Sequence, residues 1–507
     1  MTNTSTDTDT NASTDTTTDA ESKTATKPET KSKSELKTGN QPARTAAGTT
    51  RTAKDRDHPA HPDPSESAPM PMSVKNTGEI PPGEKSSSDL MPEDDGKPTA
   101  ALLATDDDDD DGERTVETSA PEEAPQRPSD NRTRRLTAWR GARRTLTGFR
   151  PPETIGERLR RLAAEAPGAY DLDDWTDFYG NDDGIVGELE RRTADALGAE
   201  AAAFFPTGTM AQQVALRCWA GRTGNATVAG HPLSHLEMHE RDAYAVVSGL
   251  RMIHPTTAPR LPTAEEIYAL QEPFGTLTLE LPLRDAGYVL PTWEELTSAV
   301  TAARDRDAVV HFDGARLWEC GPHFGRPLPE IAGLADSVYV SFYKTLGGIA
   351  GAALAGSEGF IEEARAWRHR YGGQQFQQWP AALAALAGLD RELPRLPQYV
   401  AHAKLVARAL REGLAEAGVP WFRVHPEEPH THQFQLWLPY PPEALTDAAT
   451  NQSEETRTTL FHAWRTPTPA GPPGMAMTEL TIASPALDWT TDEIRTAVAD
   501  FVQRIGT

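Results

Sequence analysis

Short apolar runs alternate with helical patterns from about residue 145 onward, and this alternation constrains the fold more than any other feature of the sequence. The runs TLTLEL, DAVVHFDG and SVYVSFY have the length and apolar content of buried strands, and TWEELTSAVTAARDR between the first two has helical spacing. Parallel strands need crossover connections, which are usually helices, so this order is typical of a mainly parallel sheet covered on both faces. The sequence therefore predicts an α/β fold.

The pattern changes beyond residue 374. Two helical segments rich in alanine and leucine, PAALAALAGLDREL and VAHAKLVARALREGLAEAG, precede polar–apolar alternation in HQFQLWLPY and ELTIAS. We therefore expect a smaller C-terminal α+β domain over residues 376–507. A large domain with the mainly parallel sheet is expected over residues 181–375, preceded by an N-terminal arm of the fold over residues 136–180.

Residues 1–135 differ in composition from the rest of the chain. They are rich in Thr, Asp, Ser, Pro, Lys and Glu, and they include the acidic run TDDDDDDGE. Such a segment cannot bury enough apolar surface to offset the entropy lost on ordering, so we expect a long disordered, acidic N-terminal arm. Acidic runs of this kind are usually solvated tails, and a docking role is the alternative.

The charge balance bears on the partners and the location. The chain has 75 acidic and 50 basic residues and a net charge of −25, so we expect no nucleic-acid partner; the one short basic patch spans residues 131–144. The N-terminal sequence has no signal-peptide pattern, and no apolar run approaches the roughly 20 residues of a membrane span, so no membrane association is expected. The two cysteines fit a reducing cytoplasm.

Three segments with chemically useful residues lie at predicted strand ends, where open α/β sheets collect ligands. In PTGTMAQQ, Thr207, Gly208 and Thr209 open a helix whose free N–H groups suit a phosphate. In HFDGARLWEC, Asp313 follows the apolar run directly, and in SFYKTLGG, Lys344 stands between a strand and a Gly-rich turn. A buried carboxylate at a strand end needs a positively charged partner.

Together these segments match what pyridoxal phosphate needs from a protein. The helix N-terminus would hold the phosphate, Lys344 would form an imine with the aldehyde, and Asp313 would pair with the protonated ring nitrogen. Partial desolvation would lower the pKa of Lys344 and make its amine nucleophilic. Asp313 alone could instead cap a helix, with Arg316 merely paired to it, but the combination with Lys344 favours the cofactor.

The segments between about residues 179 and 484 resemble the pyridoxal phosphate-dependent threonine aldolase and aromatic amino acid β-eliminating lyase family. The resemblance is carried by four blocks, FYGNDDGIVGELE, FFPTGTMAQQVAL, HFDGARLWECG and DSVYVSFYKTLGG. It implies the fold type I, aspartate-aminotransferase-like architecture of pyridoxal phosphate-dependent transferases, pyridoxal 5'-phosphate as cofactor, and a homodimer or homotetramer.

The same resemblance implies roles for individual residues. Lys344 corresponds to the Schiff-base lysine and Asp313 to the partner of the pyridine nitrogen. Arg316 would help to hold the substrate carboxylate, which its planar guanidinium group can bind through two hydrogen bonds. Gly208 and Thr209, in the helix start that Thr207 begins, would bind the phosphate.

The segment HPLSHLEMHE occupies the place where the family has a Ser-His pair. By that likeness His235 stacks on the cofactor ring, and His239 stands where the family usually has a tyrosine and could assist proton transfer. An alternative from spacing alone is a metal site, because His231, His235 and His239 recur every four positions. Pro232 disfavours a helix that contains His231, so no metal site is predicted.

The expected reaction is carbon–carbon cleavage of a β-hydroxy L-amino acid to glycine and an aldehyde. Three departures from the family concern the substrate. Leu283 or a neighbour stands at the place of a histidine that helps in the cleavage, and Thr481 stands at the place of a late arginine. In the glycine-rich segment RYGGQQFQQW, Phe376 or Gln377 stands at the place of another arginine. The alternatives are β-elimination or other chemistry at Cα on the same cofactor. An alternative of another class is a non-catalytic binding or regulatory protein that keeps the fold.

Overall fold

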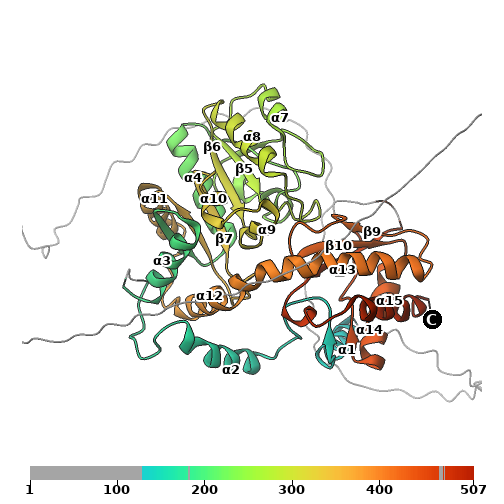
Figure 1. The fold of residues 1–507 in the computed structure, drawn as a ribbon. Coiled ribbons are helices and arrows are strands. Elements are labelled where there is room, and N and C mark those ends of the chain that lie inside the picture. The colour runs from blue at the N-terminus through green and yellow to red at the C-terminus, as the bar shows by residue number, and fades with distance from the viewer. Residues whose placement is uncertain (1–127, 181–182, 468–471, 473, 507) are drawn as a thin grey trace, which may run out of the picture. The chain divides into compact units, whose positions relative to one another are not determined.

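A computed structural model describes residues 128–180, 183–467, 472 and 474–506 (Figure 1). Most of the segment expected to be disordered, residues 1–127 with its acidic run, therefore lies outside the described residues. None of the helices in the described ranges is long and apolar enough to cross a lipid bilayer.

The end of the segment expected to be disordered is helical instead. Helix α1 (Pro128–Arg140) includes residues 128–135. Its Arg134 donates hydrogen bonds to Glu454 at 2.6 Å and to Asn451 at 2.7 Å, both on helix α14 (Pro442–Thr456). These partners lie far away in the sequence, and local composition, on which the prediction depended, carries no information about them.

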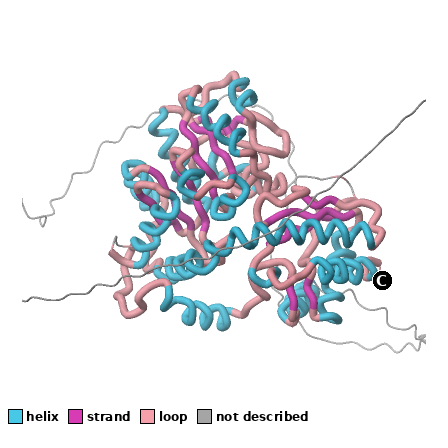
Figure 2. The backbone as a smooth tube through the Cα atoms, viewed as in Figure 1, coloured by secondary structure: helices cyan, strands magenta, loops and turns pink. Residues whose placement is uncertain are grey.

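A seven-stranded sheet forms the centre of the larger part of the chain, and its strand order is β2-β8-β7-β6-β5-β3-β4. Strands are drawn in magenta and the helices around them in cyan in Figure 2. Neighbouring strands from β7 through β4 run parallel, and β8 runs antiparallel to both β7 and β2. This confirms the predicted α/β fold with a mainly parallel sheet. The strands are β2 (Ala201–Phe205), β3 (Thr227–Ala229), β4 (Arg251–Ile253), β5 (Thr276–Glu280), β6 (Val309–Gly314), β7 (Ser337–Ser341) and β8 (Ala352–Gly356).

Strands β2 and β8 of this sheet are each buried at four of their five residues, which explains why β2 (AAAFF) and β8 (AALAG) are continuously apolar rather than alternating. Along β2, Phe204 packs into one hydrophobic cluster and Phe205 into another, as the two-residue period of a strand requires. The helices that connect and cover the strands are α3 (Ile185–Leu197), α4 (Gly208–Thr223), α5 (His235–Met238), α6 (Ala243–Val246), α7 (Ala264–Ala269), α8 (Trp293–Arg304), α9 (Gly321–Phe324), α10 (Leu328–Ala332), α11 (Glu358–Arg370) and α12 (Trp379–Glu392). Short 3-10 helices are η1 (Ala166–Gly168), η2 (Leu317–Glu319), η3 (Leu393–Arg395) and η4 (Ser484–Ala486).

A smaller antiparallel sheet, with strand order β12-β10-β9, belongs to the C-terminal part. It is formed by β9 (Arg423–His425), β10 (Gln433–Leu438) and β12 (Ala476–Thr481), with helices α13 (Leu396–Glu416), α14 and α15 (Thr491–Gln503). Helix α2 (Ile155–Glu165) and strand β1 (Arg144–Thr145) come earlier in the chain, and β1 pairs in parallel with β11 (Thr458–Thr459). The alternating polar and apolar residues thus form the α+β arrangement that the sequence predicts.

Helix α13 contributes to two hydrophobic cores. Leu396 and Tyr399 pack with the residues of the large sheet, whereas Val406 and Leu410 pack with those of the small sheet. The division of the chain at residue 375 stays a prediction.

The register of the large sheet determines which side chains meet at its carboxyl edge. Glu280 on β5 is paired with Asp313 on β6, and Asp313 is paired with Tyr339 on β7. The loop after β7 then carries Lys344. Strands β5, β6 and β7 therefore place Glu280, Asp313 and Tyr339 side by side, at the edge where ligands bind in sheets of this kind.

Candidate active site

Asp313 is a buried carboxylate, 2% exposed, near the end of β6. Its Oδ1 accepts a hydrogen bond from the backbone N–H of Ala315 at 3.1 Å. Burial raises the pKa of Asp313, and the positive charges of Lys344 and His235 oppose this rise only in part. The structure therefore brings together the carboxylate and the amine that the sequence singled out, close enough for each to affect the other's pKa.

Lys344 lies in the loop between β7 and β8. Burial, followed by the positive charge of Arg316, lowers its pKa to about 8, although Asp313 and Glu280 act in the opposite direction. A lysine with this pKa carries a substantial neutral fraction near physiological pH and can act as an amine nucleophile.

We predict that the reactivity of Lys344 toward an aldehyde follows this lowered pKa. The neutral amine is the reactive form, so the rate should rise as the pH increases to about 8 and then level off, whereas a free lysine gains neutral amine up to about pH 10.4. The measurement is the rate of borohydride-trapped modification by pyridoxal phosphate in cofactor-free protein, followed by peptide mass spectrometry. Lys404, whose side chain is 41% exposed, is the internal comparison. A Lys344 rate that still climbs at about pH 10 would contradict the prediction.

Helix α4 begins at the predicted place. Thr207 is the N-cap, and its side chain accepts a hydrogen bond from the backbone N–H of Met210 at 3.2 Å. Gly208 has no room for a side chain, because a Cβ at this position would overlap the hydroxyl group of Tyr339 on β7. The start of a 16-residue helix, with Thr207, Gly208 and Thr209, thus lies against the strand next to Asp313.

His235 is the first residue of helix α5 and is held from two sides. Its backbone N–H donates to Glu280 Oε2 at 2.7 Å, and its Nδ1 lies 3.2 Å from Glu240 Oε1. A carboxylate only accepts hydrogen bonds, so Nδ1 carries the proton and Nε2 is the free acceptor. Burial opposes the charged form, but the hydrogen bond that His235 donates to Glu240 and the charge of Asp313 raise the pKa of His235 overall.

His239 forms a close pair with a carboxylate. Its Nε2 lies 2.6 Å from Asp285 Oδ2, and its ring centroid lies 5.2 Å from that of His235. Since the carboxylate fixes the proton on Nε2, Nδ1 is the atom of His239 that can accept a proton. Arg284 lies beside this pair and is itself bound to Glu479 at 2.7 Å.

Arg316 lies over the ring of Tyr288, with 5.3 Å between its Cζ atom and the ring centroid. Its Nε atom is buried and has no hydrogen-bond partner, and no carboxylate in the described part of the chain forms an ion pair with it. The expectation that Arg316 merely pairs with Asp313 therefore finds no support among these contacts. Its guanidinium group is available for an anionic ligand.

The alternative three-histidine site does not form. His231 lies outside α5, and both of its ring nitrogens are used: Nδ1 accepts from the Leu233 N–H at 2.9 Å, and Nε2 lies 2.6 Å from the Ala258 carbonyl oxygen. Among the described residues, no group of three or more His, Cys, Asp or Glu side chains is arranged to hold a metal ion.

Leu283 and Thr481, which stand at two of the places where the sequence is expected to depart from the family, have structural roles. Leu283 is fully buried in the hydrophobic core around the large sheet. Thr481 accepts a hydrogen bond from Gln433 at 2.9 Å across the small sheet. Neither side chain is placed to take the part of the residue that it replaces.

Four carboxylates of the site were not anticipated from the sequence: Glu240, Glu280, Asp285 and Glu479. Glu280 is the most perturbed of them, because burial and the neighbouring charge of Asp313 raise its pKa to about 7. A signal was present, since Glu280 ends an otherwise apolar strand in the same way as Asp313 does. Glu240 and Asp285 act through loop packing, and Glu479 on β12 acts through a contact with Arg284, which is remote in the sequence, so none of the three leaves a pattern in the local sequence.

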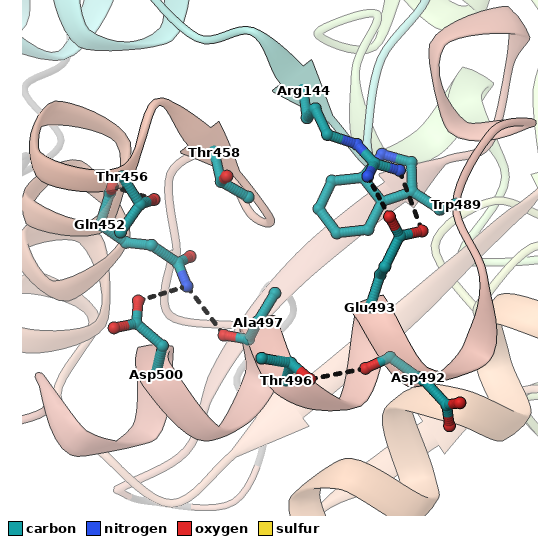
Figure 3. A pocket seen from close by; sticks show the side chains of 10 residues that line it. All are labelled: Arg144, Gln452, Thr456, Thr458, Trp489, Asp492, Glu493, Thr496, Ala497 and Asp500. Atoms are coloured by element: carbon teal, nitrogen blue, oxygen red, sulfur yellow. Dashed lines mark hydrogen bonds and ion pairs between the residues drawn. The ribbon is translucent and has the colours of Figure 1, made fainter.

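A cavity of about 490 Å³ lies away from this cluster, between β1, β11, α14 and α15 (Figure 3). None of the predicted site residues lines it. Its charged and amide groups are largely satisfied by each other, with Arg144 bound to Glu493 and Gln452 donating to Asp500 at 3.0 Å. The chemistry described above therefore belongs to the sheet edge and not to this cavity.

Comparison with known proteins agrees with this arrangement. A model of the beta-eliminating lyase family matches residues 164–433. The low-specificity L-threonine aldolase of Escherichia coli is 32% identical over 265 residues, which cover 51% of this chain and 78% of that protein.

Two solved structures are similar over a longer stretch. A candidate aromatic amino acid beta-eliminating lyase/threonine aldolase from an Exiguobacterium species is 34% identical, with a TM-score of 0.65, and the match covers 73% of this chain and 99% of that one. A candidate L-allo-threonine aldolase from Listeria monocytogenes is 31% identical, with the same TM-score and the same coverage.

Proposed function

This chain belongs to the beta-eliminating lyase family, and from that premise we propose that it is a pyridoxal phosphate-dependent lyase of the threonine aldolase type, which cleaves a β-hydroxy L-amino acid to glycine and an aldehyde. One observation carries the proposal: a buried carboxylate at the end of β6 and a lysine of lowered pKa in the loop after the adjacent strand β7 interact electrostatically. This pair is what the cofactor requires at its two reactive ends.

The residues at the sheet edge fit pyridoxal phosphate. Asp313 is buried, and no lysine or arginine of the described residues forms an ion pair with it, so a protonated ring nitrogen would supply the missing positive partner. The hydroxyl group of Ser234 and the Nε atom of Arg316 are also buried without partners. Lys344 would hold the aldehyde carbon, and the start of helix α4, with Thr207, Gly208 and Thr209, would hold the phosphate.

When bound, the cofactor supplies an electron-withdrawing ring that stabilises negative charge at the substrate Cα. Asp313 keeps the proton on the ring nitrogen that this role needs. His235 is near enough to Asp313 and Lys344 for their charges to act on its pKa, and Glu240 and Glu280 hold it through Nδ1 and the backbone N–H. Arg316, which has no carboxylate partner of its own, binds the substrate carboxylate.

His239 takes the place of the base that Leu283 cannot supply. Carbon–carbon cleavage needs a proton to leave the β-hydroxyl group, and His239 Nδ1 can accept it, because Asp285 holds the other ring nitrogen in its protonated form. The His239–Asp285 pair would thus supply the base for removal of the β-hydroxyl proton. The family resemblance implies a histidine for this step, and this chain has Leu283 or a neighbour at its place.

We predict that Asp285→Asn lowers the rate of glycine formation by about 10- to 100-fold and that His239→Phe lowers it by about 100-fold or more, in the range of lost general-base catalysis. Neither change should alter the absorbance of the bound cofactor, since neither side chain touches Asp313 or Lys344. The assay is glycine release at saturating substrate. Rates close to that of the unchanged protein would show that another group removes the proton.

The proposed reaction is tested by its products. Purified protein loaded with pyridoxal phosphate is incubated with L-threonine, L-allo-threonine and larger β-hydroxy amino acids, and glycine, aldehyde, ammonia and 2-oxo acid are measured. Glycine with an equal amount of aldehyde supports the proposal. Ammonia with 2-oxo acid would replace it by β-elimination on the same cofactor, and a protein that takes up no cofactor would be a binding or regulatory module.

We further propose a homodimer or homotetramer and a cytoplasmic location. The resemblance to the family supports the first, and the buried free thiols of Cys218 and Cys320 are compatible with the second. Sedimentation and cell fractionation are the respective tests.

A further inference from the structure

Glu319, Thr345 and His432 form a buried cluster to which the proposed reaction assigns no task. Glu319 Oε2 accepts from Thr345 Oγ1 at 2.7 Å and lies 2.8 Å from His432 Nε2. His432 Nδ1 lies 2.6 Å from the carbonyl oxygen of Ile482. The side chains of Glu319 and His432 are both fully buried.

The hydrogen-bonding groups define where the protons of this Glu319 cluster lie. A carbonyl oxygen only accepts, so His432 Nδ1 carries a proton. Glu319 Oε2 and His432 Nε2 share the second proton of the contact, at 2.8 Å. Although burial acts against it, the interaction with His432 holds the pKa of Glu319 below its usual value. The cluster is therefore a buried, hydrogen-bonded network.

Stability alone is a poor explanation for this buried network. Polar and ionisable side chains taken out of water are often no better than well-packed apolar residues of the same size. Glu319 Oε1 is also buried and has no hydrogen-bond partner, so the carboxyl group is not even fully compensated. A role in positioning explains better why polar groups stand here.

The three residues come from three segments that meet at the site. Thr345 follows Lys344 directly, Glu319 lies in η2, which Arg316 begins, and His432 precedes β10 of the small sheet. A neighbouring contact acts in the same direction, because Trp318 Nε1 donates to the Ser341 carbonyl oxygen at 3.0 Å. The Lys344 loop is thus tied to the segment after Asp313 by side chains that do not touch the reacting groups.

We propose that Glu319, Thr345 and His432 are positioning residues that fix the Lys344 loop against the strand end bearing Asp313, and that they do so from the small sheet through His432. The inference rests on the proposed function, because the distance between Lys344 and Asp313 matters only if the two residues hold one cofactor. Misplacement of a reacting group by about 1 Å can cost on the order of a hundredfold in rate.

Thr345 offers a matched pair of variants. Thr345→Val keeps the shape but removes the hydroxyl donor, whereas Thr345→Ser keeps the donor. In the full-length protein, Thr345→Val should weaken pyridoxal phosphate binding on the order of tenfold to a hundredfold and shift the pH midpoint of the bound cofactor's absorbance, and Thr345→Ser should restore both. Thr450→Val, which removes a buried hydroxyl bond within α14, should change neither quantity.

Two outcomes would overturn the inference: equal behaviour of the Val and Ser variants, or a loss of cofactor binding that merely follows a lowered melting temperature. Acetylation of Lys344 by acetic anhydride, followed by peptide mass spectrometry, separates this from failure of the proposed function, since this reagent needs only the neutral amine and no bound cofactor. In cofactor-free protein, Thr345→Val and Glu319→Gln should both move the pH midpoint of Lys344 modification, and Thr345→Ser should not. An unmoved midpoint in the first two would refute the positioning role even if the unchanged protein makes glycine.

Discussion

Replacement of Lys344 by alanine is expected to abolish cleavage, with a fall in turnover of at least about a thousandfold, because the amine that holds the cofactor is lost. Among the described residues, Lys344 is the one lysine of the site, and its lowered pKa marks it as the reactive amine. The protein should also lose the visible absorbance of covalently held pyridoxal phosphate, and borohydride should no longer fix the cofactor to the chain. Both are measured on purified protein.

The control for this prediction is Lys404→Ala. Lys404 lies on α13 and is paired with Glu428 at 2.6 Å, so its removal should leave absorbance and turnover unchanged. Melting temperatures of the two variants should be similar. A Lys344→Ala protein that keeps its colour and its activity would remove the basis of the proposed function.

Asp313→Asn is expected to lower turnover by about 100- to 10,000-fold while pyridoxal phosphate still binds. An amide of nearly the same size cannot keep a proton on the ring nitrogen, so the ring would withdraw electrons less strongly. The expected signature is a large fall in kcat with a smaller change in KM, measured through glycine release, together with a changed absorbance spectrum.

Asp336→Asn is the matched control. Asp336 also lies at the sheet, where its Oδ2 accepts from the Val310 N–H at 2.7 Å, but its contact is with a backbone group at the opposite end of β6. We expect a modest loss of stability and unchanged spectra. If Asp313→Asn were as active as the control, the ring nitrogen would not depend on this carboxylate.

Much of the fold follows from the sequence because its signals are local. The strand SVYVS has no charged residue and is buried at every position, since both faces of the sheet are covered. Helix α8 is preceded by its N-cap Thr292, whose side chain and Glu295 cap each other's backbone N–H groups. Asp313 and Lys344 were recognisable because each follows such a strand. Helix α1 was missed because the residues that order it, Glu454 and Asn451, are remote in the sequence.

The parts of the site that escaped prediction depend on register and packing. Glu280 becomes important because β5 is paired with β6 in one specific register, which a single sequence does not reveal. Asp285 matters only because its loop reaches His239, and Glu240 because it turns back toward His235. Such carboxylates look like ordinary surface residues until the loops are placed.

The shared helix α13 limits how the enzyme can move. Its 21 residues run without interruption from the core of the large sheet into that of the small one. A wide swing of one sheet against the other would have to break several consecutive backbone hydrogen bonds or expose leucines that are now fully covered, and both are costly. Access to the cofactor should therefore be governed by the loops that surround it, with the two sheets travelling as nearly one rigid body.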